Sequence, residues 1–192
     1  MSPNYWSEFY KHFDVMEPSP FALWVNERIP PESRIADVGG GNGRDTVFFR
    51  SKGHSADVID PNSLFPDASH QSASNFDYTG YNIIYCRWFL HAVPWEIQRE
   101  FLKKIPNEAG LFIEARSSKD INPPQDDHYR NPINMREFAN LLYVMDYRVL
   151  FIRESLGWSK NETDDPLLIR IIARKPLSIG KTDLDVSEPR GY

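Results

Sequence analysis

Residues 34–60 read RIADVGGGNGRDTVFFRSKGHSADVID, and this stretch decides the fold. Residues 35–38, which are apolar except for Asp37, stand directly before a glycine cluster, which predicts a buried strand. Residues 45–52 predict a helix, and residues 55–59 predict a second strand. Asp60 follows this second strand. The stretch therefore predicts a strand, a glycine loop, a helix and a strand that ends on a carboxylate.

Between the first strand and the helix, residues 39–43 are four glycines and Asn42. Glycine adopts positive φ and lets a ligand approach the backbone closely. Backbone N–H groups line such a loop, and the carboxylate of Asp60 can accept hydrogen bonds from the hydroxyls of a ribose. The segment therefore predicts a nucleoside site, although a tight turn in another kind of α/β protein would also explain the glycines.

Residues 37–43, DVGGGNG, fit the D-x-G-x-G-x-G pattern of class I S-adenosylmethionine (SAM) methyltransferases better than the dinucleotide-binding pattern. The segment therefore resembles that family. The resemblance implies that three of the loop glycines border the methionine part of SAM and that Asp60 holds its ribose. The cofactor-binding residues that it implies are Asp37, Gly39, Gly41, Asn42, Gly43 and Asp60.

The composition suits one globular domain with a core, since 41% of the 192 residues are hydrophobic. We expect this domain to span residues 1–175 and residues 176–192 to form a loose tail. The net charge of −5 disfavours broad nucleic-acid binding. A single cysteine gives no disulfide framework, so we expect a reducing, cytoplasmic location. We expect neither a signal peptide nor a membrane span, because the first ten residues are aromatic and polar and no apolar run approaches about 20 residues.

The remaining pattern completes an α/β fold. Further strands are expected at 81–85, 111–116, 148–153 and 167–173, and further helices at 4–13, 21–28, 94–104 and 133–144. Residues 61–80 carry prolines and many serines where a doubly wound sheet normally has a helix and a third strand, so we expect only a remnant of that strand, at 75–78. The last two strands look like the antiparallel hairpin that ends the class I methyltransferase sheet. The predicted fold is a single doubly wound, Rossmann-like domain, mostly parallel, with a contracted third strand and helix.

Polar side chains stand at the ends of two predicted strands. Arg87 and His91 follow one of them, and ligands gather at the carboxyl ends of strands in α/β sheets. In the strand at 111–116, alternation places Glu114 and Arg116 on one face. A histidine that is hydrogen-bonded within a helical turn, or a simple ion pair between Glu114 and Arg116, would also explain these residues.

The loop at 117–132 is long, polar and rich in proline, and long loops in compact domains are often functional. It carries Lys119, His128, Tyr129 and Arg130. Solvated loop charge is the alternative explanation for these residues. The aromatic segment at 4–13 likewise has two interpretations, because it either packs on the core or covers the cofactor.

The resemblance extends over nearly the whole chain except 61–80. The residues that carry it are Tyr5-Trp6, 85–91, 113–117, Lys119-Asp120, 128–130, Glu154-Ser155, and 164–166 with Arg170. These segments are similar to short bacterial class I methyltransferases found in capsule, surface-polysaccharide and natural-product clusters. The substrates of that subgroup are diverse, so the resemblance names no single substrate.

The basic residues predict a small anionic substrate, because arginine forks match phosphate, sulfate or carboxylate with paired hydrogen bonds. The catalytic candidates are Arg87, His91, Glu114, Arg116 and His128, and the substrate-binding candidates are Tyr5, Trp6, Lys119, Tyr129, Arg130, Arg153 and Arg170. His91, His128 or Glu114 would serve as the base for a hydroxyl acceptor, whereas a phosphate or carboxylate oxygen needs none. No metal site is predicted.

The predicted function is SAM-dependent methyl transfer to this anionic metabolite, and the contracted segment at 61–80 supports two alternatives. One is an enzyme of this fold that has lost SAM and uses its cationic pocket for elimination or ring closure of a sulfate or phosphate ester, as in aziridine formation. The other is a non-catalytic partner subunit. Both a protein partner and a homodimer are compatible with the sequence.

Overall fold

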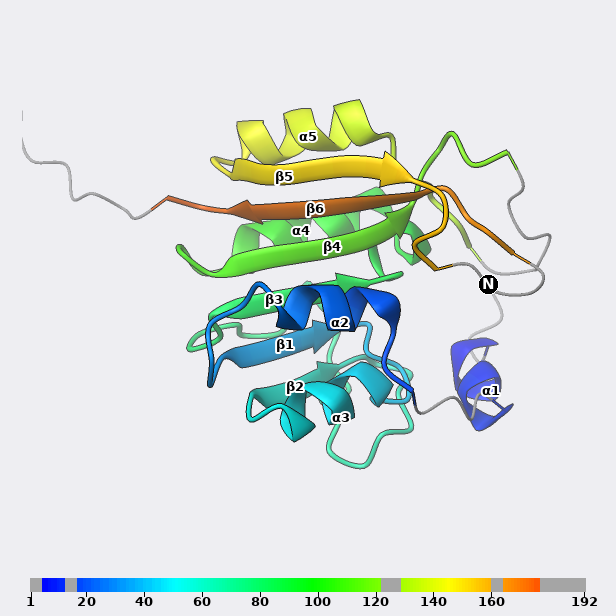
Figure 1. Ribbon diagram of the computed structural model, residues 1–192, viewed down its shortest axis with the longest axis vertical. Helices are drawn as coiled ribbons and strands as arrows, with labels where there is room; N and C mark the ends of the chain where they lie inside the picture. The colour runs from blue at the N-terminus through cyan, green and yellow to red at the C-terminus, as the bar shows by residue number, and fades with distance from the viewer. Residues whose placement is uncertain (1–4, 13–16, 122–128, 160–163, 177–192) are drawn as a thin grey trace, which may run out of the picture.

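The computed structural model describes residues 5–12, 17–121, 129–159 and 164–176. One six-stranded sheet organises them, in the strand order β2-β1-β3-β4-β6-β5 (Figure 1). Its strands are β1 (Arg34–Val38), β2 (Ser55–Ile59), β3 (Ile83–Arg87), β4 (Gly110–Arg116), β5 (Arg148–Ser155) and β6 (Leu168–Arg174). The first four strands in the chain pair in parallel, whereas β6 runs antiparallel to both β4 and β5. The mostly parallel sheet with an antiparallel C-terminal pair confirms the predicted fold class.

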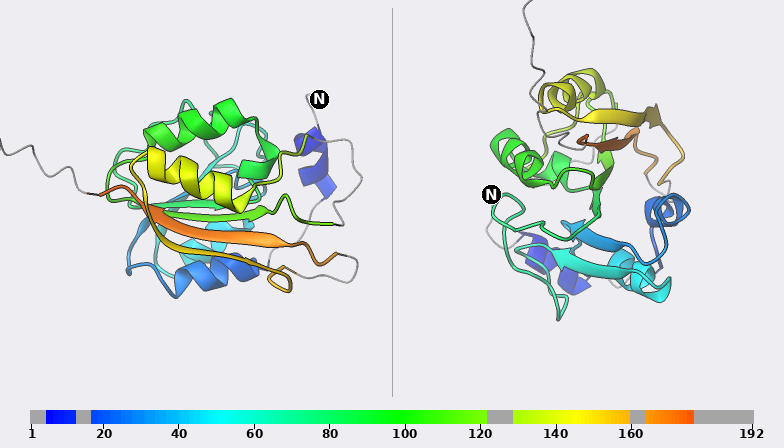
Figure 2. Two further views of the ribbon diagram at one scale, coloured as in Figure 1. Left: turned by 90° about the horizontal axis from the view of Figure 1, so that it is seen from above. Right: turned by 90° about the vertical axis from the view of Figure 1, so that its left-hand side faces the viewer.

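Helices cover both faces of the sheet. α2 (Pro20–Asn26) and α3 (Arg44–Ser51) lie on one face, and α4 (Trp95–Lys104) and α5 (Met135–Val144) lie on the other (Figure 2). α1 (Tyr5–His12) lies beyond the carboxyl ends of β1 and β2, and the short helix η1 (Leu90–Ala92) links β3 to α4 (Figure 1). In the described ranges, no helix combines the length and the apolar character needed to cross a membrane.

Strand alternation divides the core into two layers. In β4, Ile113 and Ala115 pack in the layer that includes side chains of α4 and α5, whereas Phe112 packs with side chains of α2 and α3, as strand alternation requires. β1 contributes to both layers, because Ile35 and Ala36 are each fully buried on opposite faces. Parallel strands that are covered by helices on both faces have mostly apolar sequences without alternation. This explains the mostly apolar sequence of β1 before the glycine loop.

Residues 61–80 form turns in place of a helix and a third strand, as expected for a contracted segment. The remnant of the strand is a single parallel bridge between Ile59 and Ser69, so its predicted position at 75–78 is wrong. The ring of Tyr78 is buried instead and packs edge to face against a phenylalanine of α4, with ring centroids 5.6 Å apart. Burial of this aromatic ring explains why the segment turns inward rather than extending the sheet.

The strand predicted at 81–85 begins two residues later, at Ile83, and therefore includes Arg87 as its last residue. Tyr81 still belongs to the preceding turn, since its N–H donates to the carbonyl oxygen of Tyr78 over 3.1 Å. Arg87 is thus held by the sheet itself and not by the loop that follows.

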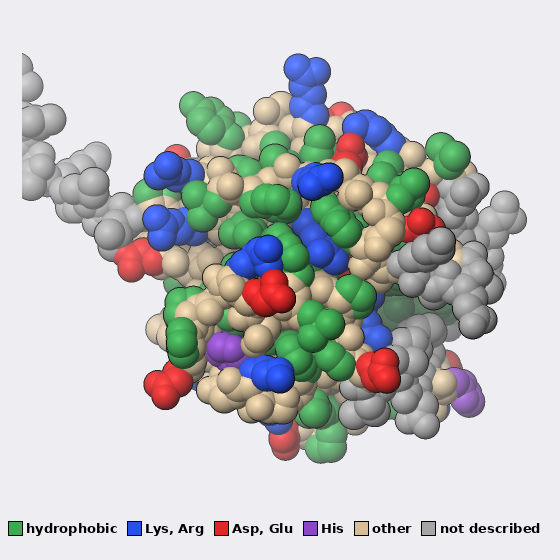
Figure 3. Space-filling model, viewed as in Figure 1, with side chains coloured by type: hydrophobic (Ala, Val, Ile, Leu, Met, Phe, Trp, Pro, Cys, Tyr) green, Lys and Arg blue, Asp and Glu red, His purple; other side chains and the backbone are tan. Residues whose placement is uncertain are grey.

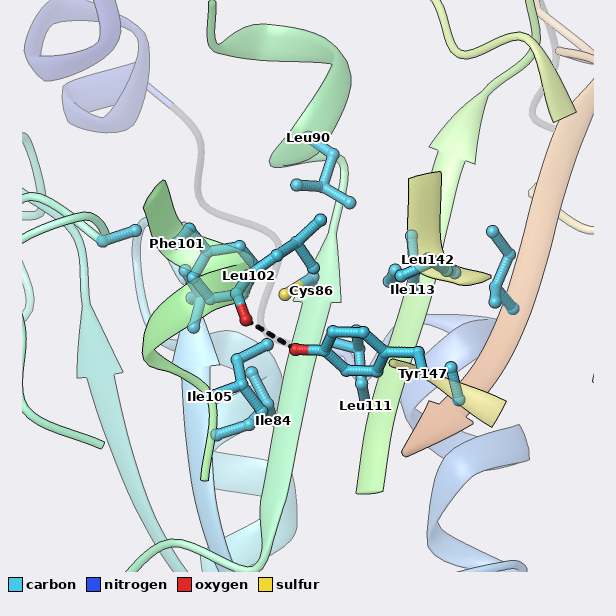
Figure 4. Packing of buried hydrophobic residues seen from close by; sticks show 14 of the residues in the cluster. Ile84, Cys86, Leu90, Phe101, Leu102, Ile105, Leu111, Ile113, Leu142 and Tyr147 are labelled. Carbon is cyan, nitrogen blue, oxygen red and sulfur yellow. Dashed lines mark hydrogen bonds between the residues drawn. The ribbon is translucent and has the colours of Figure 1, made fainter. Parts of the chain in front are cut away.

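The buried hydroxyl of Tyr147 allows a test of the packing between β5 and α4. This hydroxyl donates to the carbonyl oxygen of Leu102 over 2.7 Å (Figure 4). Tyr147→Phe keeps the ring but removes the hydrogen bond, so the free energy of unfolding should fall by about 1 kcal/mol. Tyr143→Phe is the matched control, because Tyr143 is 79% exposed, and its effect should stay below about 0.5 kcal/mol. Urea denaturation measures both variants, and equal effects would contradict the prediction.

Candidate functional site

Asp60, which follows β2, holds the glycine loop through a hydrogen bond. The N–H of Gly41 donates to Asp60 Oδ2 over 3.1 Å, and the N–H of Asn62 donates to Asp60 Oδ1 over 2.8 Å. Ser63 adds a further hydrogen bond to the loop, since its hydroxyl donates to the carbonyl oxygen of Gly41 over 2.5 Å. Burial raises the pKa of the Asp60 carboxyl, and these backbone N–H groups oppose that rise. The loop and the carboxylate that the sequence singled out therefore form one structural unit.

Aromatic side chains press against the loop glycines. Gly41 and Gly43 have φ of +57° and +76°, and a Cβ on either glycine would come within 2.5 Å of a ring atom, of Tyr10 in the first case and of Phe65 in the second. Both positions therefore require glycine for their backbone conformation and for the close approach of a ring. Tyr10 comes from α1, so the aromatic N-terminal segment packs on the glycine loop. Burial and the charges of Asp60 and Asp37 raise the pKa of the Tyr10 hydroxyl.

This contact predicts the effect of Gly41→Ala. The new Cβ would collide with the ring of Tyr10 and push α1 away from the loop. Trypsin should then cleave after Lys11, which lies on α1, about fivefold faster or more. Gly53→Ala is the matched control, because Gly53 also has a positive φ but nothing lies within 4 Å of its added Cβ. Equal cleavage rates in the two variants would show that Tyr10 does not hold α1 in place.

Two further carboxylates are buried beside the loop. Asp37, at the end of β1, accepts a hydrogen bond from the hydroxyl of Thr46 over 2.7 Å. Asp45, in the first turn of α3, accepts hydrogen bonds from the backbone N–H and the hydroxyl of Ser19 and from the hydroxyl of Tyr85. Burial and the neighbouring charge of Asp45 raise the pKa of Asp37 to about 7. Asp37 therefore changes its protonation near neutral pH.

The raised pKa of Asp37 makes stability depend on pH. Its ordinary pKa is 3.8, so between about pH 4 and 7 the folded chain holds a proton that the unfolded chain has released. This contribution to stability is complete below pH 4 and is lost as the pH rises through 7. Relative to Asp37→Asn, the protein should lose up to about 4 kcal/mol over this range, at about 1.4 kcal/mol per pKa unit. Denaturation of both proteins from pH 4 to 8 measures this, with the exposed Asp67→Asn as control, and a pH-independent difference would contradict it.

A row of charged side chains crosses three strands on the α2 side of the sheet. Arg87 of β3 pairs in register with Glu114 of β4, which pairs in register with Arg170 of β6. Arg170 donates to Glu114 Oε2 from Nε over 2.8 Å and lies 2.7 Å away through Nη2, and Arg87 Nε lies 3.3 Å from Glu114 Oε1. Burial raises the pKa of Glu114, and the two guanidinium groups oppose that rise. Both arginines therefore hold the carboxylate of Glu114.

Arg116 belongs to a second cluster. Its guanidinium is 3% exposed and forms ion pairs with Asp120, over 2.8 Å, and with Asp164. Its backbone N–H donates to His91 Nδ1 over 3.2 Å. In the neutral imidazole this bond places the ring proton on Nε2. His91 therefore presents a donor at Nε2, and its Nδ1 lone pair is already engaged.

A cavity of about 160 Å³ lies at the second cluster. Its lining residues are His91, Arg116, Ser117, Ser118, Asp120, Arg130 and Pro132. The structure thus brings together three predicted site residues, from η1, from the end of β4 and from the loop before α5. The cavity lies at the carboxyl edge of the sheet, where ligands of α/β proteins bind.

Other predicted site residues lie apart from this cavity. Lys119 is 63% exposed and pairs with Glu154 over 2.7 Å, and Arg153 is exposed on the edge strand β5. Tyr5 and Trp6 lie in α1, where their rings pack edge to face. His128 lies outside the described residues, and its neighbour Tyr129 is exposed. On the face that Figure 3 shows, basic side chains alternate with acidic and apolar ones, so no single basic patch covers that face.

Sequence reasoning did not identify Trp88, which joins the two clusters. Its ring lies against the guanidinium groups of Arg87 and Arg116, whose carbons are 4.7 and 5.3 Å from the ring centroid. Its φ is +56°, a conformation that bulky residues rarely adopt. No local sequence pattern predicts that a tryptophan adopts a left-handed backbone conformation. Its position directly after Arg87, at the end of a strand, nevertheless indicated a residue near the binding edge of the sheet. Among the described residues, no group of three or more His, Cys, Asp or Glu could hold a metal ion.

No family model and no curated protein matches the sequence. Solved structures do match the fold. A SAM-dependent methyltransferase from Methanosarcina mazei is 17% identical, with 80% of this chain and 97% of that chain covered and a TM-score of 0.66. The 1,6-didemethyltoxoflavin-N1-methyltransferase of Burkholderia thailandensis, solved with S-adenosylhomocysteine, is 15% identical over 88% of this chain and 81% of that chain, with a TM-score of 0.68. The [4+2]-cyclase SpnF is 13% identical over 81% and 79%, with a TM-score of 0.64.

These similarities concern the fold, because all three identities are low. The chain has the fold of class I SAM-dependent methyltransferases, which was the predicted resemblance. The same fold carries methyl transfer in two of these structures and a cyclisation in the third, by their names. Activity must therefore be argued from the site residues of this chain.

Proposed function

We propose that this protein is a SAM-dependent methyltransferase that acts on a small anionic metabolite in bacterial natural-product or surface-polysaccharide biosynthesis. One observation carries the proposal: the glycine loop after β1 is fastened through the Gly41 N–H to Asp60, at the end of β2. This arrangement leaves loop backbone and a carboxylate side by side at the carboxyl edge of the sheet. Such an edge suits the amino-acid and ribose parts of a nucleoside cofactor.

The donor set fits SAM. Each oxygen of Asp60 accepts one backbone N–H, and a carboxylate oxygen can accept a further hydrogen bond, from a ribose hydroxyl. Gly39, Gly41 and Gly43 would border the methionine part, and the rings of Tyr10 and Phe65 would move off the loop to admit it. When bound, SAM would supply an electrophilic methyl group. The work of the chain is to exclude water and to hold the acceptor in line with that group.

Of the three candidate bases, the two in the described residues are already engaged, which favours an acceptor that needs no base. Glu114 is held by Arg87 and Arg170, and His91 accepts the Arg116 N–H at Nδ1. A phosphate or carboxylate oxygen is nucleophilic without deprotonation at neutral pH, whereas a hydroxyl is not. Arg130 and Arg116 at the cavity would bind such an acceptor, which would compete with Asp120 and Asp164 for the guanidinium group of Arg116.

Calorimetric titration with SAM and S-adenosylhomocysteine tests the proposal. We expect micromolar binding that weakens at least about tenfold in Asp60→Ala, because a buried charged acceptor of the ribose is lost. Asp60→Asn retains an acceptor for the Gly41 N–H and separates loop disorder from loss of the ribose contact. Asp67→Ala, at an exposed aspartate, should bind normally. Absence of binding in the unmodified protein would overturn the proposal.

A second candidate function is elimination or ring closure of a sulfate or phosphate ester without SAM. The contacts of Tyr10 and Phe65 with the loop glycines favour it, because these rings fill space directly above the loop. The contraction of the third strand to one bridge favours it as well. In such an enzyme Arg87, Arg116 and Arg130 would stabilise the charge of the leaving group. The calorimetric titration distinguishes the two candidates, since only the first requires the cofactor.

A further inference from the structure

Buried N–H groups gather around Trp88 without acceptors. Trp88 Nε1, Arg116 Nε and Arg87 Nε make no hydrogen bond to any residue that the structure describes. Buried donors are nearly always paired, so each exception needs an explanation. Arg87 Nε has a partial one, because Glu114 Oε1 lies 3.3 Å away without good hydrogen-bond alignment. The indole N–H of Trp88 has no such compensation.

The backbone holds Trp88 in place at a cost. A φ of +56° is unfavourable for a bulky residue and persists only where the surroundings impose it. The backbone N–H of Trp88 donates to the carbonyl oxygen of Glu114 over 2.8 Å, which ties the residue to β4. Its ring packs between the guanidinium groups of Arg87 and Arg116 and lies edge to face with His91, at 6.1 Å between centroids. Strained positions of this kind cluster at binding sites.

The cavity adjoins this tryptophan. Arg116 and His91, which both contact the Trp88 ring, also line the cavity of about 160 Å³, together with Arg130. A cavity of about this size holds a group of several non-hydrogen atoms. Trp88 and Arg87 do not line the cavity, but Trp88 contacts two residues that do, and the unpaired Nε of Arg116 belongs to one of them.

We infer that Trp88, Arg116 and Arg130 form an oxyanion-binding site that receives the carboxylate, sulfate or phosphate group of the substrate. An oxyanion supplies several acceptor atoms, which the unpaired Nε–H of Arg116 and indole N–H of Trp88 require. The inference deepens the proposed function and rests on it only in assigning the anion to the substrate. Trp88 is then a specificity-determining residue that holds both arginines and contributes a donor of its own.

Two aspartates currently hold the guanidinium ends of Arg116, where an incoming oxyanion would bind. Asp120 is 6% exposed and Asp164 is 24% exposed, so Asp164 is the carboxylate that an oxyanion displaces. Asp164→Asn removes this competing charge. The variant should therefore bind sulfate more tightly than the unmodified protein does.

Indole N–H resonances provide the direct test. The chain has five tryptophans, and ¹⁵N-tryptophan labelling gives one indole signal for each, with Trp88→Phe assigning the relevant one. Sodium sulfate, phosphate and acetate are titrated at constant ionic strength against sodium chloride. We expect a saturable downfield shift of the Trp88 indole proton and no such shift for Trp95, which is 42% exposed on α4. A Trp88 signal that none of the three anions moves would overturn the inference.

Substitutions at the cavity test the arginine contribution. Arg130→Gln should weaken sulfate binding about tenfold or more, because a charge-assisted contact is lost. Arg136→Gln, at an exposed residue of α5, is the control and should stay within about twofold. Arg130→Gln leaves the ion pairs of Arg116 intact, so the fold is expected to persist. An unchanged affinity in Arg130→Gln would also overturn the inference.

Calorimetry with S-adenosylhomocysteine on the same samples separates this inference from the proposed function. Binding of S-adenosylhomocysteine without any anion response would remove the oxyanion site and leave methyl transfer standing. An anion response without S-adenosylhomocysteine binding would retain the oxyanion site and remove methyl transfer.

Discussion

The burial of negative charge at the carboxyl edge of the sheet is the constraint on which the rest of this structure depends. Within the described ranges, the buried carboxylates are those of Asp37, Asp45, Asp60 and Glu114. A carboxylate removed from water needs donors or cations close by, and each of these four carboxylates is stabilised by a different kind of group. Asp60 uses the backbone of the glycine loop, Asp45 uses hydroxyl groups, and Glu114 uses two arginines. Asp37 has one hydroxyl donor and a raised pKa.

These solutions determine what the edge of the sheet can bind. The hydrogen bond between Gly41 and Asp60 connects the loop to β2, so the proposed nucleoside site and the burial of the Asp60 charge involve the same contact. The pairing of Glu114 with Arg87 and Arg170 places positive charge beside that loop and leaves Glu114 unsuited to proton abstraction. A site with strong cations and engaged bases suits acceptors that already carry negative charge.

Aromatic side chains from outside the sheet pack against the groups at its carboxyl edge. Tyr10 and Phe65 contact glycines of the loop, and the ring of Trp88 lies against the guanidinium groups of Arg87 and Arg116. α1 covers the proposed cofactor side, and Trp88 borders the proposed substrate side.

Local sequence patterns were enough to predict the β–loop–α–β unit, the order of the other elements and the residues at the strand ends, because apolar periodicity and glycine placement act over a few neighbouring residues. Which charges meet depends instead on how distant segments pack. Glu114 and Arg170 are 56 residues apart, and their contact depends on the register between β4 and β6. The left-handed backbone of Trp88 and the single bridge at Ser69 likewise depend on packing around them. Sheet register and side-chain burial are long-range properties, so local sequence patterns do not contain them.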